Sequence, residues 1–113
     1  MKPLTHKTKV AFEKWYFQTH CKCSIKFEDL LTWQKAEIFD WLYSQSETIQ
    51  HAFFIEFFDS VGIYIDIIRS IIPTESPFTY HINGKRLANF WRHTRPEATS
   101  KALEKANDFF NNR

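Results

Sequence analysis

The spacing of apolar residues alternates along this chain between a helical and an extended pattern. Apolar side chains recur every three or four residues in the N-terminal half and near the C-terminus. Between Ile63 and Ile71, apolar residues instead tend to occupy alternate positions. The expected elements, in chain order, are helices at 8–19, 28–43 and 45–60, a strand at 63–71, a strand at 78–83, a third strand that returns from it, and a closing helix after Thr94. The second helix has a shorter alternative that begins at Trp33 with Thr32 as its cap.

Each amphipathic helix has one face that we expect to be buried. The expected buried faces are Ala11, Phe12, Trp15, Tyr16 and Thr19 in the first helix, Leu30, Leu31, Gln34, Ile38, Trp41 and Leu42 in the second, and Ala98, Ala102, Leu103, Ala106, Phe109 and Phe110 in the closing helix. The small alanines of the closing helix indicate close packing on the sheet.

The longest apolar stretch, residues 51–72, is "HAFFIEFFDSVGIYIDIIRSII". Four charged residues interrupt it, and each would cost about 2.5–3.5 kcal/mol at the centre of a bilayer, which argues against a membrane span. Gly62 lies between the helical and the alternating halves, and glycine alone takes positive φ without a steric penalty. We therefore expect a buried helix, a turn at Gly62 and a strand in which Ile63, Ile65, Ile67 and Ile71 share a face.

Two helix starts carry capping signals. Ser44 and Glu47 have the spacing of a capping box, which predicts that the third helix begins near Gln45. Thr94 and Glu97 repeat that spacing, and Pro96 falls in the first turn, where a missing N–H does no harm.

Asn83-Gly84 between two β-rich runs is a strong signal for a two-residue hairpin turn. In that register Tyr80, Ile82 and Leu87 share one face, and Thr79, His81, Arg86 and Ala88 share a polar face open to solvent or a partner. The predicted fold class is α+β: one domain, residues 1–113, with three N-terminal helices, a three-stranded antiparallel β-meander and a C-terminal helix packed on the sheet.

The composition adds an excess of aromatic residues, with 12 Phe, 4 Trp and 4 Tyr in 113 residues. A core this small cannot hide all of these rings, so an aromatic contact surface is expected. The 2 glycines exclude a glycine-rich phosphate loop. The charges are sorted along the chain: residues 1–26 carry net +5, residues 27–78 net −7 and residues 79–113 net +4. Two interpretations stay open: the basic and acidic segments neutralise each other within the protein, or they form separate basic and acidic faces that contact different partners.

His20, Cys21 and Cys23 are the residues with potential metal or nucleophile chemistry. A closed zinc site needs four ligands, and the sequence has no second cluster of ligands. We therefore expect these residues to lie in a loop with reduced thiols and no metal. Metal binding by the three residues is left as an alternative. The carboxylates Glu56, Asp59 and Asp66 are expected to be a solvated edge, with Asp59 capping the turn. We predict no catalytic residues, no cofactor and no small-molecule substrate, and hence no enzyme.

The candidate binding residues are basic and aromatic and lie near the C-terminus. They are Arg86, Trp91, Arg92, Arg95, Lys101 and Lys105. Cations around an exposed ring suit a nucleic-acid backbone with base stacking, while the start of a helix favours anions. The alternative is an ordinary charged surface over a core tryptophan.

Two segments, "FFDSVGIYIDI" at 57–67 and "TRPEATSKALEKANDFFNN" at 94–112, resemble parts of small, mostly uncharacterised accessory proteins of phages and prophages. That resemblance implies a mobile-element protein, and such proteins often counter host defences by binding, anti-CRISPR proteins among them. The strand order and alanine-rich closing helix are also similar to the double-stranded RNA-binding domain. That family has a lysine pair where this chain reads Arg95-Pro96-Glu97, which weakens the likeness.

We therefore expect a non-enzymatic phage or prophage protein of the host bacterial cytoplasm, without a signal peptide. Its expected activity is inhibition of a bacterial defence system, with an RNA-guided CRISPR nuclease or its guide RNA as the partner. The alternatives are a free-standing nucleic-acid-binding module and a structural or dimerising phage protein. Its oligomeric state is left open.

Overall fold

The computed structural model describes residues 4–21, 23–86 and 91–113. Its elements, in chain order, are α1 (His6–His20), the 3-10 turn η1 (Phe27–Asp29), α2 (Thr32–Tyr43), α3 (Glu47–Ser60), β1 (Ile65–Arg69), β2 (Phe78–Ile82) and α4 (Arg95–Asn111). The mixed α+β content is confirmed. The longer version of the second predicted helix begins too early, since residues 27–29 form a separate turn, and the observed start of α2 at Thr32 agrees within one residue with the shorter version.

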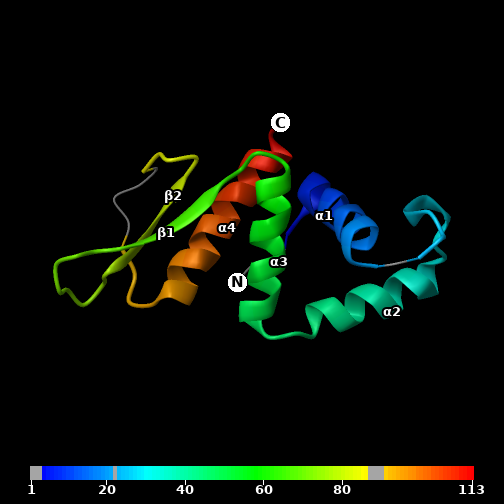
Figure 1. Ribbon diagram of the computed structural model, residues 1–113, viewed down its shortest axis with the longest axis horizontal. Helices are drawn as coiled ribbons and strands as arrows, with labels where there is room; N and C mark the ends of the chain where they lie inside the picture. The colour runs from blue at the N-terminus through cyan, green and yellow to red at the C-terminus, as the bar shows by residue number, and fades with distance from the viewer. Residues whose placement is uncertain (1–3, 22, 87–90) are drawn as a thin grey trace.

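The molecule is elongated, with extents of 51 × 28 × 21 Å along its principal axes. Figure 1 shows the β1–β2 ribbon and the start of α4 at one end, α1 and α3 in the middle, and α2 with η1 at the other end. The two ends are therefore separate surfaces joined by a helical core.

The core is built from aromatic rings of α1 and α3 against α4 and the ribbon. Phe12 of α1 meets Phe54 and Phe57 of α3 edge to face, with ring centroids 4.9 and 5.7 Å apart. Such edge-to-face pairs are favoured because the positive ring edge meets the negative face. On α4, Ala98 and Ala102 are fully buried, and their small side chains let the helix lie close to β2, as the sequence predicted.

Helix α1 has no side-chain cap of its own, and α4 supplies one. Asn107 Oδ1 accepts a hydrogen bond from the Thr5 N–H at 3.0 Å, and Asn111 Oδ1 accepts one from the Thr8 N–H at 2.9 Å. Both donors belong to the first turn, whose N–H groups have no partner within the helix. The C-terminal helix α4 thus caps the N-terminal end of α1.

The turn at Gly62 is confirmed. Helix α3 ends at Ser60, and Gly62 has φ +83. The Gly62 N–H donates to the Asp59 carbonyl at 3.2 Å, and the Ile63 N–H donates to the Phe58 carbonyl at 2.8 Å. These two bonds define a Schellman motif, in which a left-handed residue satisfies the last carbonyls of the helix. Asp59 therefore contributes its backbone carbonyl to this turn.

One predicted cap is confirmed and one is wrong. Thr94 caps α4, and its Oγ1 accepts the Glu97 N–H at 3.3 Å. Helix α3, however, begins at Glu47 and is capped by Ser46, whose Oγ accepts the Ile49 N–H at 3.4 Å. Ser44 does not start α3, because it is the C-cap of α2 with helical dihedrals (φ −85, ψ −10), whereas an N-cap residue takes an extended backbone.

The predicted three-stranded meander is wrong: the described residues form a two-stranded sheet. Strands β1 and β2 pair antiparallel over 65–69 and 78–82, as expected. The Asn83-Gly84 turn also forms, with φ 53 and 76, and Ile82 bridges Lys85. The next described bridge joins Phe78 to Arg92. Because β2 takes four steps between these bridges and the return segment takes seven, a regular third strand cannot keep register. The predicted pairing of Leu87 and placement of Ala88 lie outside the described residues.

Several predicted faces also need correction. Thr79, placed on the open face of the hairpin, is buried, and Ile71 is 98% exposed because β1 ends before it. Phe109 of the closing helix is exposed, as is Thr19 of α1, whereas Thr8 is buried. On α2 the buried residues are Phe39 and Leu42, while Leu31 and Trp41 point to solvent. Every helix in the described ranges is too short or too polar to cross a bilayer.

Candidate nucleic-acid interface

The sheet register places Arg69, Phe78 and Arg92 in one row. Arg69 is opposite Phe78 in the β1–β2 ladder. The Phe78 N–H donates to the Arg92 carbonyl at 3.0 Å, and the Arg92 N–H donates to the Phe78 carbonyl at 2.7 Å. Since directly opposite residues of antiparallel strands point to the same face, two arginine side chains flank one phenylalanine ring.

Arg95 adds a third cation to this row from the first residue of α4. Its Cζ lies 5.4 Å from the centroid of the Phe78 ring. A guanidinium over a ring uses its face for the cation–π contact, while its planar N–H edge is the part that forms bidentate bonds to phosphate or carboxylate. The contact therefore orders Arg95 without consuming the group that would bind an anion.

A second stack lies next to the row. The Cζ of Arg86 is 5.5 Å from the Trp91 ring, and Arg92 Nη1 donates to the Trp91 carbonyl at 3.1 Å. We call the six residues of the row and this stack the arginine–aromatic cluster: Arg69, Phe78, Arg86, Trp91, Arg92 and Arg95.

The two lysines predicted with these arginines have other surroundings. Lys101 Nζ lies 3.4 Å from Glu104 Oε2, in an open depression of about 510 Å³ that also contains Glu47, Glu97 and Arg92. Carboxylates there offset the cations. Lys105 Nζ lies 5.5 Å from the Phe109 ring, further along α4. The structure thus brings together four of the six predicted residues, namely Arg86, Trp91, Arg92 and Arg95, and places both lysines outside the cluster.

The sequence reading missed Arg69 and Phe78. Arg69 is absent from the binding residues that the sequence predicts, although pairing of the predicted strands 63–71 and 78–83 brings it near the start of β2. Phe78 was not singled out, because its place between two arginines depends on the bridge to Arg92.

The loop 70–77 extends beyond the cluster at the end of the ribbon. Its Ile71 and Ile72 are 98% and 69% exposed. The Ser70 N–H donates to the Pro77 carbonyl at 2.7 Å, and a ring nitrogen of His93 contacts the Glu75 carbonyl, so the loop is held at both ends. An apolar tip therefore projects next to the cationic residues.

The His20–Cys23 segment provides neither a metal cluster nor an activated thiol. No group of three or more metal-ligating side chains occurs in the described part of the chain. His20 Nε2 lies 3.3 Å from Glu56 Oε1, and its ring stacks on Tyr16. Burial, followed by the neighbouring Cys23, raises the pKa of the Cys21 thiol, which is opposite to the shift that a nucleophile needs.

The carboxylates near Gly62 are close enough to influence one another. Burial raises the pKa of Asp59, and the charges of Asp66 and Glu56 raise it further. All three residues are exposed, as expected for a solvated edge.

Comparison of this chain with protein-family models, curated proteins and solved structures finds no match. The fold and the cluster therefore define a small α+β protein with a cationic, aromatic end, and its function is argued from that geometry.

Proposed function

We propose that this protein is a phage- or prophage-encoded inhibitor that binds an RNA-guided CRISPR nuclease at its guide RNA, using the arginine–aromatic cluster. The supporting observation is that Arg69 and Arg92 are both paired with Phe78 across the ribbon, while Arg95 lies over the Phe78 ring. Arginines ordered in this way suit phosphates, and the Trp91 ring adds a flat apolar surface for a base. Inhibition would be by occlusion, since the protein would cover RNA that the nuclease must expose.

The electrostatic argument sets the expected behaviour of this complex. Each phosphate that an arginine neutralises releases counterions, so the affinity should fall steeply as salt is raised. Lys101 should contribute less than Arg69 and Arg95, because Glu104 and two further carboxylates share its depression. Arg92 lines the same depression, so these carboxylates should reduce its contribution as well.

The test is charge reversal at two arginines that meet at Phe78. The variant Arg92→Glu/Arg95→Glu should bind the RNA-loaded nuclease at least a hundredfold more weakly, because two charge-assisted contacts of about 1.5 kcal/mol or more each are lost. A neutral variant, Arg92→Gln/Arg95→Gln, should lie in between. Binding is measured by fluorescence anisotropy at two salt concentrations, and the melting temperature of each variant is recorded alongside.

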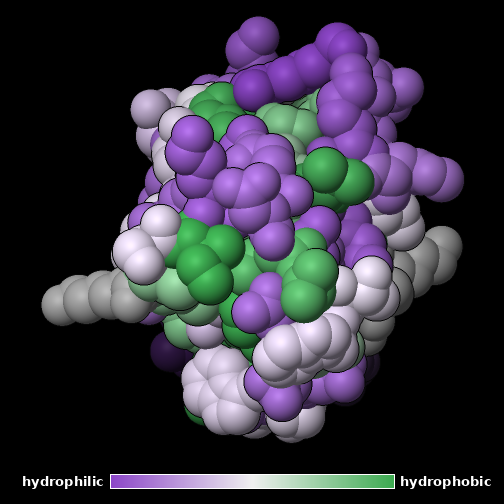
Figure 2. All heavy atoms as spheres, turned by 90° about the vertical axis from the view of Figure 1, so that its right-hand side faces the viewer, coloured by the Kyte–Doolittle hydropathy of each residue, from purple (hydrophilic) through white to green (hydrophobic). Residues whose placement is uncertain are grey.

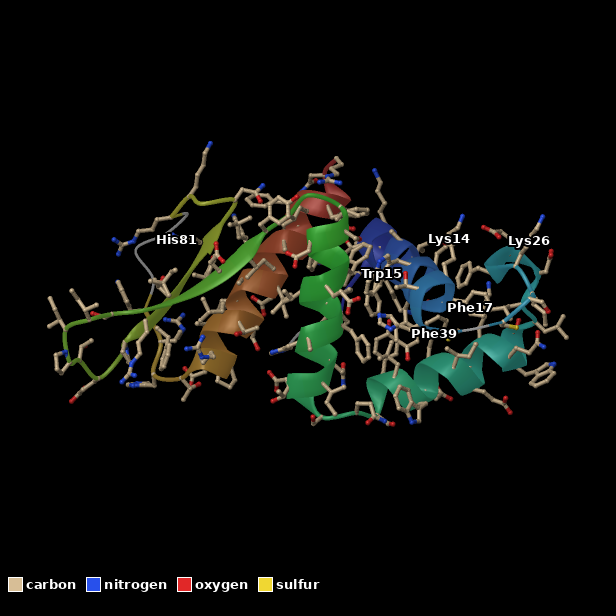
Figure 3. The ribbon with its side chains drawn as sticks, viewed as in Figure 1. Lys14, Trp15, Phe17, Lys26, Phe39 and His81 are labelled. Carbon is tan, nitrogen blue, oxygen red and sulfur yellow. The ribbon has the colours of Figure 1, made fainter. Side chains whose placement is uncertain are left out.

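The matched control reverses two lysines that lie away from the cluster, Lys9→Glu/Lys26→Glu. Figure 3 shows Lys26 at the opposite end of the molecule from His81 of the ribbon. This control has the same net charge as the reversed variant and should bind nearly as well as the wild type. Equal binding by the reversed variant, with unchanged melting, would remove the cluster as the site.

A second measurement separates inhibition from simple RNA binding. In cells that express the nuclease, the wild-type protein should restore plaques of a targeted phage, and the reversed variant should not. Tight binding to bare guide RNA without restored plaques would instead support the free-standing nucleic-acid-binding module.

A further inference from the structure

Helix α2 presents two tryptophans and an acid to solvent along one side. Trp33, Glu37 and Trp41 are spaced at i, i+4 and i+8, which places them on one face of the helix, with the two rings about 12 Å apart along its axis. Trp33 is 58% exposed and Trp41 is 54% exposed. The opposite side of α2 carries Phe39 and Leu42, which are buried. We call Trp33, Glu37, Asp40 and Trp41 the acidic tryptophan stripe.

This exposure is unusual for tryptophan, which buries more apolar area than any other side chain. Trp15 is half-buried against Phe12 and Phe57, so the core does receive tryptophan from α1. Tryptophan is also enriched among the residues that dominate binding energy at protein interfaces. A pair of exposed rings on one helix face is therefore typical of a contact surface.

An apolar groove of about 300 Å³ lies next to the stripe. It is lined by Trp33 and by side chains of α1, the following loop and α2, among them Phe17, Ile25, Leu30 and Ile38. Figure 2 looks onto this end of the molecule, where several hydrophobic residues reach the surface among hydrophilic ones. The groove could receive one apolar side chain beside the tryptophans.

The exposed face of α2 is acidic, although two lysines of the preceding segment, Lys14 and Lys26, lie at the same end of the molecule (Figure 3). Lys14 is paired with Glu28, with Nζ and Oε1 2.6 Å apart, so it does not neutralise the acids of the stripe. Residues 27–40 contain four acids and the single cation Lys35, a net charge of −3. Lys35 Nζ lies 4.7 Å from the Phe27 ring, so its charge is directed toward η1. Glu37 and Asp40 are both exposed beside the rings. A partner that fits must bring positive charge.

A second copy of the same helix does not fit as well. Two α2 helices paired antiparallel about a two-fold axis near residue 37 would oppose Trp33 to Trp41 but would also place Glu37 against Glu37. Like charges in direct opposition disfavour a pairing, whereas arginine or lysine would meet both a ring face and a carboxylate.

We infer that the acidic tryptophan stripe binds a cationic amphipathic helix of a partner protein. Its arginines or lysines, three or four residues apart, stack on Trp33 and Trp41 and pair with Glu37 and Asp40, while an apolar residue between them enters the groove. This surface is independent of the arginine–aromatic cluster, which lies at the other end of the long axis (Figure 1).

The test begins with a display library of helical 18-residue peptides, selected against the full-length protein. The probes are the enriched peptides, and they are then titrated against variants of the stripe. We expect enriched sequences to be net positive, with Arg or Lys at three- or four-residue spacing around apolar positions. Their binding should shift the indole N–H resonances of Trp33 and Trp41 but not those of Trp15 and Trp91.

Two substitutions test the two parts of the stripe. Glu37→Lys/Asp40→Lys should weaken peptide binding at least tenfold, and Trp33→Ala should do so as well, with Trp33→Phe in between. The matched control is Asp66→Lys/Asp108→Lys, which makes the same charge change at exposed positions elsewhere and should bind like the wild type. Arg92→Glu/Arg95→Glu should also bind the peptides normally, so failure of the nucleic-acid proposal would leave this one standing.

The inference would be overturned by any of three results. Enriched peptides could be neutral or acidic, or they could bind equally to the Glu37→Lys/Asp40→Lys variant. Sedimentation could also show a dimer of the wild type that the same variant dissociates, which would make a second copy the occupant.

Discussion

Replacing Asn107 tests whether the capping of α1 by side chains of α4 stabilises the fold. Its Oδ1 accepts the Thr5 N–H at 3.0 Å, and its Nδ2 donates to Thr5 Oγ1 at 3.0 Å. Asn107→Ala deletes both hydrogen bonds, each worth about 1 kcal/mol net, and leaves the part-buried Thr5 N–H without this partner, which costs about 1 kcal/mol more. We therefore expect the free energy of unfolding to fall by about 2–3 kcal/mol, or the melting temperature by roughly 8–12 °C for a chain of this size.

Urea unfolding followed by circular dichroism measures this loss. Asn107→Asp keeps the acceptor and places a negative charge at the start of α1, where the helix dipole favours it, so it should recover most of the stability. The matched control is Asn112→Ala, because Asn112 is exposed and its side chain donates only within α4, to the Asp108 carbonyl at 2.8 Å. If Asn107→Ala unfolded within about 0.5 kcal/mol of the wild type, the idea that α4 caps α1 would be wrong.

Two further predictions concern titration and backbone conformation. Burial lowers the pKa of His51, and nearby Glu47 offsets this only in part, so the unfolded chain takes up a proton at higher pH than the folded protein. The free energy of unfolding should then decrease as the pH falls below about 6.5, by at most about 1.4 kcal/mol per pH unit from this group, and urea titrations of His51→Phe between pH 7 and 5 should lack that component. Gly62→Ala should cost about 1–2 kcal/mol, because alanine at φ +83 is strained although nothing lies near its added Cβ. Gly62→Asn should cost less, since asparagine tolerates that region, and equal stability of the alanine variant and the wild type in thermal melts would contradict this account.

The features that the sequence predicted correctly depend on neighbours within a few residues. Gly62 ends α3 and Asn83-Gly84 forms its turn because positive φ is a property of one or two residues. Thr94 caps α4 through a contact three residues away. The Ser44 prediction used the same logic and was wrong, because Ser44 keeps helical dihedrals at the end of α2 and Ser46, two residues later, caps α3.

The features that could not be predicted join distant parts of the chain. Asn107 and Asn111 meet Thr5 and Thr8 across about a hundred residues, and no local pattern marks a polar side chain as the acceptor for the first N–H groups of another helix. The third strand was expected from the hairpin turn, but its register depends on three extra residues between Lys85 and Arg92. The three extra residues also place Arg92 opposite Phe78. The segment whose strand was wrongly predicted is therefore the one that brings Arg92 into the cluster.

The last two of the three charged segments of the chain supply different surfaces of the molecule, and this bears on the proposed function, whereas Lys14 and Lys26 of the basic segment 1–26 lie at the same end as α2 (Figure 3). The net positive segment 79–113 supplies most of the arginine–aromatic cluster, and the net negative segment 27–78 supplies the acidic tryptophan stripe. The cluster lies at the ribbon end and the stripe on α2, on the other side of α3 (Figure 1). Exposed charges farther apart than the screening length of about 8 Å at physiological salt are largely screened, so we expect each surface to bind its partner independently. An RNA-loaded nuclease offers both kinds of partner, because the protein segments that hold its RNA are themselves rich in arginine and lysine. A simple nucleic-acid-binding module would need the cluster alone, and two exposed tryptophans on an acidic helix would then lack a purpose. The presence of both the arginine–aromatic cluster and the acidic tryptophan stripe therefore favours our proposal of binding to a ribonucleoprotein over binding to bare RNA.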